Sequence, residues 1–224
     1  MAYRETHKMR DRKAATREHL LTCAQQLVAS AGFSALQMQQ LANHAGVATG
    51  TLYRYFPAKE QLAAEVFKRA TRIEVAQVAQ ALTVSAAAPT QIAHALNVFA
   101  LRALRAPTLA WALIAEPVEA AVDQQRLQFR QQYAELFATS IQRGIDNQQL
   151  PAQNAQLSST AIVGAIAEAL ICPLAQVSRH TEANTPQPST TVVDDIVQFC
   201  LRGLLAAPYS TATTPKLIQE NADD

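Results

Sequence analysis

Glycine is scarce in this sequence, and no charge of one sign dominates it. Only six of the 224 residues are glycine, 49% are hydrophobic, and the formal net charge is +1. Alanine, leucine and glutamine, which are compatible with helices, are abundant instead. This composition predicts an all-α protein with enough apolar material for one large or two small domains.

Cysteine is also rare, and its three positions, Cys23, Cys172 and Cys200, lie far apart. Each falls within an apolar helical pattern, which predicts free, buried thiols and neither a disulfide framework nor a zinc site. The five histidines have no metal-ligand spacing, and the sequence contains neither a Gly-x-Ser-x-Gly motif nor a phosphate-binding glycine-rich loop. We therefore expect no enzyme activity, no metal and no cofactor.

Targeting segments are a third absence. The N-terminus is charged, which predicts no signal peptide, and we expect no apolar run that approaches the ~20 residues of a membrane span. We expect a soluble, cytoplasmic protein that does not contact a membrane. Charge is unevenly spread, however, because eleven Lys or Arg stand against six Asp or Glu through Gln80. This excess of positive charge in the N-terminal part of the chain is a modest indication of nucleic-acid binding.

The stretch Gly46–Phe56 is the most informative part of the chain. It follows a segment, Leu36–Ala45, whose apolar residues have helical spacing. A glycine then opens a tight turn, and a short helix is expected over 48–55, with Leu52 and Phe56 pointing inward. Helix, glycine turn and short second helix are the sequence form of a helix-turn-helix. Its small residues, tyrosines and arginine suit close approach to phosphate oxygens.

Two longer helices are expected to flank this motif. The first covers 12–31, is stopped by a glycine and follows a flexible basic arm over 1–11. Ser34, with a glutamine three places on, is predicted to cap the second helix. A fourth helix is expected over 58–82 as a linker to the rest of the chain.

The segment Gly32–Glu60 closely resembles the DNA-binding domain of the TetR/AcrR family. The family pattern Gly-Val-x-x-Gly-Thr-Leu-Tyr-x-Tyr/His-Phe-x-x-Lys is met at every fixed position from Gly46 to Lys59. The resemblance covers about 14–74 and implies a three-helix head on an all-helical body for ligand binding and dimerisation. Leu36 and Ala58 depart from it, because the family has capping hydroxyl residues there, and a lost cap costs ~1 kcal/mol.

The resemblance also implies which residues of the head, expected at 12–57 and extending to about 74, contact DNA. Base edges would be approached by Thr49, Gly50 and Thr51, and Ala48 just before them also belongs to the DNA-binding set. Phosphates would be held by Tyr53, Tyr55 and Lys59, with Arg54 in either role. Gln37 and Gln39 would bond phosphates or bases, although a solvated helix face is the alternative for these glutamines.

An Ala- and Ser-rich joint at 83–89 separates the head and linker from a body expected at 90–206. The body helices are predicted at 90–105, 108–115, 117–149, 157–177 and 192–205, with a loop at 179–191 and a loose tail over 207–224. Glu116 and Glu119 are expected to be exposed carboxylates that favour the dipole of the 117–149 helix.

Candidate ligand and dimer residues lie in this body, because helical ligand sites are apolar cavities with a few polar groups. The pocket candidates are Phe99, Trp111, Phe129, Tyr133, Phe137 and Cys172. The residues that resemble the family's dimer interface are Gly164, Ala167, Ile171, Ile196, Cys200 and Leu204. Packing within one chain is the alternative for both sets.

These features together predict a homodimeric transcriptional regulator, most simply a repressor. It would bind a palindromic double-stranded operator and leave it when a small apolar or amphipathic effector occupies the body. An activator or ligand-independent regulator on the same scaffold is one alternative. A helical protein-interaction module with secondary DNA binding is another.

Overall fold

The computed structural model describes residues 7–179 and 190–206, which are helical and contain no strand. Most of the expected loop at 179–191 and the expected tail over 207–224 lie outside these ranges. The helices are α1 (His7–Ala31), α2 (Met38–His44), α3 (Thr49–Tyr55), α4 (Lys59–Ala81), α5 (Ala88–Arg105), α6 (Pro107–Ile114), α7 (Ala120–Asp146), α8 (Ala155–Arg179) and α9 (Thr190–Leu205), with a 3₁₀ turn, η1 (Phe33–Ala35). The predicted all-α fold is confirmed.

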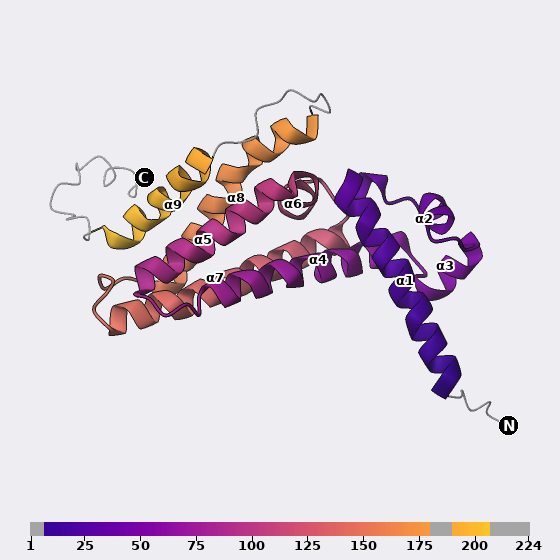
Figure 1. Ribbon diagram of the computed structural model, residues 1–224, viewed down its shortest axis with the longest axis horizontal. Coiled ribbons are helices and arrows are strands. Elements are labelled where there is room, and N and C mark those ends of the chain that lie inside the picture. Colours follow the sequence, from indigo (N-terminus) through magenta and orange to yellow (C-terminus); the bar gives the residue numbers. More distant parts are fainter. Residues whose placement is uncertain (1–6, 180–189, 207–224) are drawn as a thin grey trace, which may run out of the picture.

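Helices α1, α2 and α3 form a head at one end of an elongated body (Figure 1). Leu20, Leu41 and Leu52 are fully buried in the core of this head. Gly32 and Gly46 have φ values of 79° and 67°, in the left-handed region that glycine enters without strain. The chain therefore ends α1 and turns between α2 and α3 at these two glycines.

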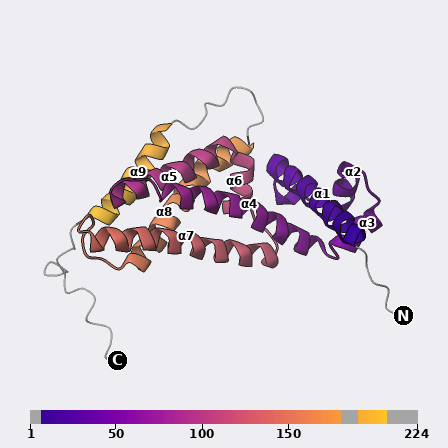
Figure 2. The ribbon, with the colours of Figure 1, turned by 60° about the horizontal axis from the view of Figure 1, so that its bottom comes forward.

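Helix α4 leaves the head and packs along α5 and α7 of the body, as Figures 1 and 2 show. Helix α7 packs in turn against α8, and α5 packs against α9. Leu96, Ile141 and Leu170 are fully buried where these helices meet. Because α4 belongs to both the head core and the body core, a shift of this helix in the body must move the head.

The head and body also share apolar contacts. The Phe33 ring of the head lies 6.2 Å from the Phe67 ring of α4, and Phe67 lies 6.0 Å from the Phe129 ring of α7. Ala112 and Val122 of the body are buried in the same cluster as the head core. The head is thus docked on the body by continuous packing.

Two features of the head's helices differ from the sequence prediction. Helix α1 begins at His7, so the last residues of the expected arm are helical. Gln37 is the N-cap of α2, without a side-chain capping bond, so the predicted capping role of Ser34 is wrong. Ala58 is the N-cap residue of α4. Because alanine has no hydroxyl, it makes no side-chain capping bond, as expected from the sequence. Buried Leu36 contributes apolar packing where the family has a capping hydroxyl.

The connection between α6 and α7 is longer than predicted. Helix α7 begins at Ala120 and not at Pro117, which leaves the segment Ala115–Glu119 outside either helix. Glu119 is the N-cap of α7 and has an extended backbone. We call Ala115–Glu119 the α6–α7 loop.

Helix α8 contradicts the expectation that no apolar run approaches the length of a membrane span. Its segment Ala155–Ala175 is long and apolar enough to cross a membrane by length and composition alone. The core helix of a soluble protein meets the same criterion, and α8 packs against α6, α7 and α9 here. This packing explains the buried third of the segment, whereas residues such as Leu157 leave an exposed apolar face on α8.

Candidate DNA-binding face and ligand cavity

The short helix α3 presents one face to the core and the other to solvent. Leu52 and Phe56 are 0% and 2% exposed, which confirms that they anchor the motif. Tyr53 is 48% exposed, and Arg54 beside it is also exposed. Among the other predicted contacts, Ala48 and Gly50 are exposed, and Thr49, Thr51 and Tyr55 are half-buried. The helix therefore offers small, hydroxyl and cationic side chains on one accessible surface.

Helix α2 is connected to this surface by side-chain hydrogen bonds. Thr49 Oγ1 donates to Gln39 Oε1 at 2.9 Å, and Gln39 Nε2 donates to Asn43 Oδ1 at 3.3 Å. Gln37 is exposed, and its Nε2 donates to the Ser34 carbonyl oxygen at 3.3 Å. Gln39 and Thr49 are thus brought together, and their bond fixes the start of α3 relative to α2.

Lys59 begins α4 beside this surface and is paired with the body. Its Nζ lies 3.3 Å from Glu119 Oε1, with side chains 28% and 38% exposed. A phosphate group near Lys59 would have to compete with this carboxylate.

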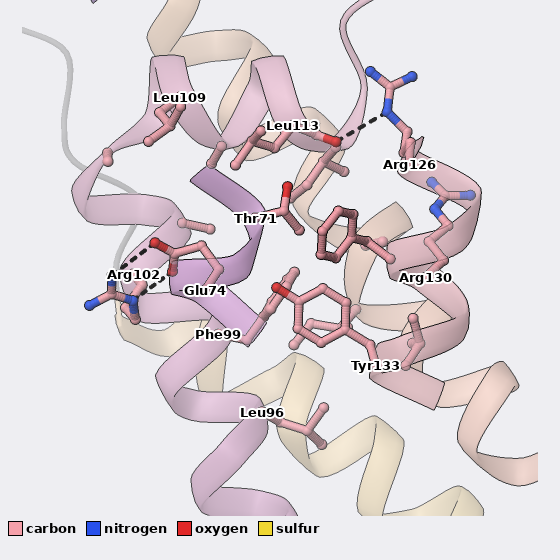
Figure 3. A pocket seen from close by; sticks show the side chains of 18 of the residues that line it. Thr71, Glu74, Leu96, Phe99, Arg102, Leu109, Leu113, Arg126, Arg130 and Tyr133 are labelled. Carbon is pink, nitrogen blue, oxygen red and sulfur yellow. Dashed lines mark hydrogen bonds and ion pairs between the residues drawn. The ribbon is translucent and has the colours of Figure 1, made fainter. Parts of the chain in front are cut away.

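A cavity of about 90 Å³ lies in the body next to α4 (Figure 3). Four of the predicted pocket residues, Phe99, Phe129, Tyr133 and Phe137, line it. The other two predictions are wrong: Trp111 packs against the body core, and Cys172 is exposed on α8. The remaining walls are mostly apolar and come from α4 to α8: Phe67, Leu96, Ala103, Ala106, Leu109, Ala110, Leu113, Ile114, Val163, Ile166 and Ala167.

Two hydroxyl groups are buried in the cavity wall, and Figure 3 shows their side chains around the same space. Thr71 is 5% exposed, and its Oγ1 has no hydrogen-bond partner. Tyr133 is 8% exposed, and its ring meets Phe99 edge-on with centroids 5.5 Å apart. Burial, reinforced by the nearby Glu74 charge, raises the pKa of Tyr133, so its hydroxyl stays protonated. These hydroxyls can bond a polar group of an otherwise apolar molecule.

Charged side chains border the same cavity. Glu74 of α4 and Arg102 of α5 form a bidentate pair with bonds of 2.6 and 2.8 Å. The bond to Glu74 raises the pKa of Arg102, whereas burial lowers the pKa of Arg126 on α7. Sequence reasoning missed these residues because Glu74 and Arg102 are distant in the chain, and no local pattern links them.

The structure contradicts the expectation for Glu116. It is 7% exposed, and it accepts hydrogen bonds from the backbone amides of Phe33 at 2.8 Å and Ser34 at 2.9 Å. The expectation that it is an exposed, helix-favouring carboxylate is wrong, because the α6–α7 loop turns its side chain into the head.

The predicted dimer residues divide into two groups. Gly164 is exposed on α8, and Ile171 is half-buried. The other four are at most 8% exposed: Ile196, Cys200 and Leu204 pack in the body core, and Ala167 lines the cavity. Their side chains therefore offer little surface to a second copy. The exposed positions of the same helices include Leu157, which is 67% exposed, and Phe199, which is 69% exposed.

The prediction of free, buried thiols is confirmed for Cys23 and Cys200, which are free and buried. Cys172 is free but exposed, so the prediction that it is buried is wrong.

A helix-turn-helix head on a helical body with a cavity defines a class of transcriptional regulators. The family model for "Bacterial regulatory proteins, tetR family" matches residues 20–66. The repressor KstR of Rhodococcus jostii (strain RHA1) is 42% identical over 53 residues, 24% of this chain and 25% of that protein. KstR of Mycobacterium tuberculosis (strain ATCC 25618 / H37Rv) is 44% identical over 46 residues, 20% of this chain and 21% of that protein. Both alignments thus span a quarter or less of these curated relatives.

Solved structures share the whole fold. FadR of Bacillus subtilis in complex with stearoyl-CoA has a TM-score of 0.68 and 18% identity, covering 84% of this chain and 98% of that one. RolR in complex with resorcinol has a TM-score of 0.64 and 18% identity, covering 87% and 89%. The family model and the two KstR alignments thus identify the head as a TetR-type DNA-binding domain, and the solved structures show that head and body together have the fold of TetR-type regulators.

Proposed function

We propose that this protein is a cytoplasmic, homodimeric transcriptional repressor that a small apolar or amphipathic molecule releases from a palindromic operator. The observation that carries the proposal is the combination of an exposed α3 surface with an apolar cavity beside α4. Helix α4 joins the two sites, so a change in cavity shape can alter the position of the head.

The DNA contacts follow from the chemistry of the exposed surface. Thr49, Gly50 and Thr51, with Ala48 before them, are small enough for α3 to approach base edges in the major groove. Tyr53, Tyr55 and Lys59 bond phosphates, and Arg54 serves either role. Gln37 and Gln39 extend the same surface from α2.

The ligand must be mainly apolar, because the cavity walls are. Stearoyl-CoA in FadR and resorcinol in RolR are both partly apolar molecules with hydroxyl, carbonyl or ionic groups. Here Thr71 and Tyr133 are suited to one such polar group. An apolar cavity of about 150 Å³ holds benzene, so the 90 Å³ cavity must widen to admit a larger molecule. A ligand of that size therefore favours a wider conformation, and this difference in affinity is what release requires.

The dimer uses the exposed faces of α8 and α9. A Cβ added at Gly164 would have no neighbouring element within 4 Å, and Phe199 presents a large apolar ring. These residues can pack on a second copy without disturbing the body core. Two heads related by a two-fold axis would read two half-sites, since one recognition helix spans only a few base pairs.

Selection of randomised duplex DNA by the purified protein tests this function. An enriched inverted repeat, released when metabolites that raise the melting temperature are added, is the expected outcome. A reporter fused to the native promoter separates repression from activation. A body that captures a specific protein and binds neither DNA nor small molecules would refute the proposal.

A further inference from the structure

The α6–α7 loop makes a polar contact between the head and the body through one buried carboxylate. Glu116 Oε2 accepts from the Phe33 amide at 2.8 Å, and Oε1 accepts from the Ser34 amide at 2.9 Å. We call this contact the Glu116 bridge. Gly32 leaves the space for it, because a Cβ at Gly32 would lie 2.8 to 3.1 Å from carboxylate atoms. The bridge joins residues more than eighty positions apart in the chain. A larger residue at position 32 would collide with the Glu116 carboxylate.

The bridge holds the head in a defined orientation. Both carboxylate oxygens are used, each by an amide of the turn that joins α1 to α2. Hydrogen bonds to an ionised acceptor are about twice as strong as neutral ones, and burial strengthens them further. Because the two amides belong to consecutive residues, the carboxylate restrains the direction of this turn as well as its distance from the body.

Arg126 connects the bridge to the ligand cavity. Its Nη2 donates to the Glu116 carbonyl oxygen at 2.8 Å and to the Ala112 carbonyl oxygen at 3.3 Å. Its Nε donates to the Leu113 carbonyl oxygen at 3.1 Å, the bond drawn in Figure 3. Nη1 meets Asp123 at 3.1 Å, and the side chain is only 12% exposed. One guanidinium therefore fixes the end of α6 and the start of the loop while forming part of the cavity wall.

Aromatic contacts form a second connection between the cavity and the Glu116 bridge. Phe129 and Phe67 both line the cavity, and Phe67 contacts Phe33, whose amide is held by Glu116. Widening the cavity between α6 and α7 would strain the Arg126 bonds and this aromatic packing together.

We propose that Glu116 is the positioning residue that keeps the head in its DNA-binding orientation, and that a ligand which displaces Arg126 releases the head by breaking the Glu116 bridge. This inference rests on the proposed function, in which the narrow-cavity conformation binds the operator. Two bistable contacts, one in the cavity wall and one at the head, then change together.

Glu116→Gln is the direct test, because glutamine keeps the size but has one acceptor oxygen for two amides. We expect exchange of the Phe33 and Ser34 amides, measured by NMR, to accelerate about 10- to 100-fold. Affinity for the operator selected by the wild-type protein should fall, while the salt dependence stays unchanged because Glu116 contacts no phosphate. General destabilisation would instead accelerate exchange across the head. Glu119→Gln removes the same charge from the same loop and should leave both amides protected.

Arg126→Lys provides a second variant should Glu116→Gln fold poorly. Lysine keeps the charge but has its donors on a single nitrogen, which cannot reproduce the spread of Nε and Nη2 toward three carbonyls. The Phe33 and Ser34 amides should therefore again exchange faster, although Arg126 touches neither. Unchanged amide exchange or unchanged operator affinity in Glu116→Gln would overturn the bridge, and unchanged exchange in Arg126→Lys would overturn the link to the cavity. Failure of the proposed function is distinct, since the wild-type protein would then enrich no operator.

Discussion

The Lys59–Glu119 ion pair allows the DNA-binding surface to be tested through a residue that does not belong to it. Lys59 Nζ lies 3.3 Å from Glu119 Oε1, and both side chains are partly exposed. If Lys59 holds a phosphate, it must leave this carboxylate when DNA binds. Glu119→Gln removes the competing charge and keeps the side-chain size, so the variant should bind the operator more tightly.

The size of the effect follows from the exposure of the pair. Partly exposed pairs contribute about 0.2 to 1 kcal/mol, which corresponds to an affinity gain of about 1.4- to 5-fold for each head. Two heads on one operator would multiply this to about 2- to 30-fold. Lys59→Ala should instead weaken binding and reduce the slope of log K against log salt by about 0.9 for each head.

Fluorescence anisotropy of a labelled operator at several salt concentrations measures both quantities. In a double-mutant cycle, Glu119→Gln should have little effect once Lys59 is alanine, because the competition no longer exists. An equal gain in both backgrounds would show that Glu119 acts through the general field of the head. That result would refute the assignment of Lys59 to a phosphate.

Three further predictions concern other sites. Tyr53→Phe should weaken binding to all DNA sequences alike, and altered sequence preference in a repeated selection would contradict its phosphate role. Thr71→Val should stabilise the fold by about 1 kcal/mol and raise the melting temperature by about 2 to 4 °C, because an unpaired buried hydroxyl is removed; a lower melting temperature would contradict this reading. Gly164→Glu should give folded monomers by light scattering, since the new side chain has space in the chain itself; a persistent dimer would exclude this face as the interface.

The head could be predicted from the sequence because its signals are local. Gly46 predicts a turn, and the spacing of Leu52 and Phe56 predicts a buried helix face within the same dozen residues. The structure has both features. The predicted capping role of Ser34 is wrong because α2 begins only at Met38, with Gln37 as its N-cap. Ser34 lies in η1 instead, and its amide donates to Glu116 of the body.

The body was less predictable, because helical periodicity identifies an apolar stripe but not its neighbour. Ala167 and Gly164 are one turn apart on α8, yet Ala167 lines the cavity and Gly164 faces solvent. Glu116 and Arg126 appear in the sequence as ordinary charged residues near a helix start. Their roles depend on how the α6–α7 loop meets the head, which is a tertiary contact without a local signature.

The most direct test of the account is selection of randomised duplex DNA followed by titration of the enriched duplex with metabolites that stabilise the protein. The expected result is an inverted repeat bound by two copies of the chain, with half-site centres about one helical turn or a multiple apart. A stabilising, mainly apolar metabolite should also lower the affinity for this duplex. An unenriched library, or an operator whose affinity no stabilising metabolite changes, would contradict the central claim.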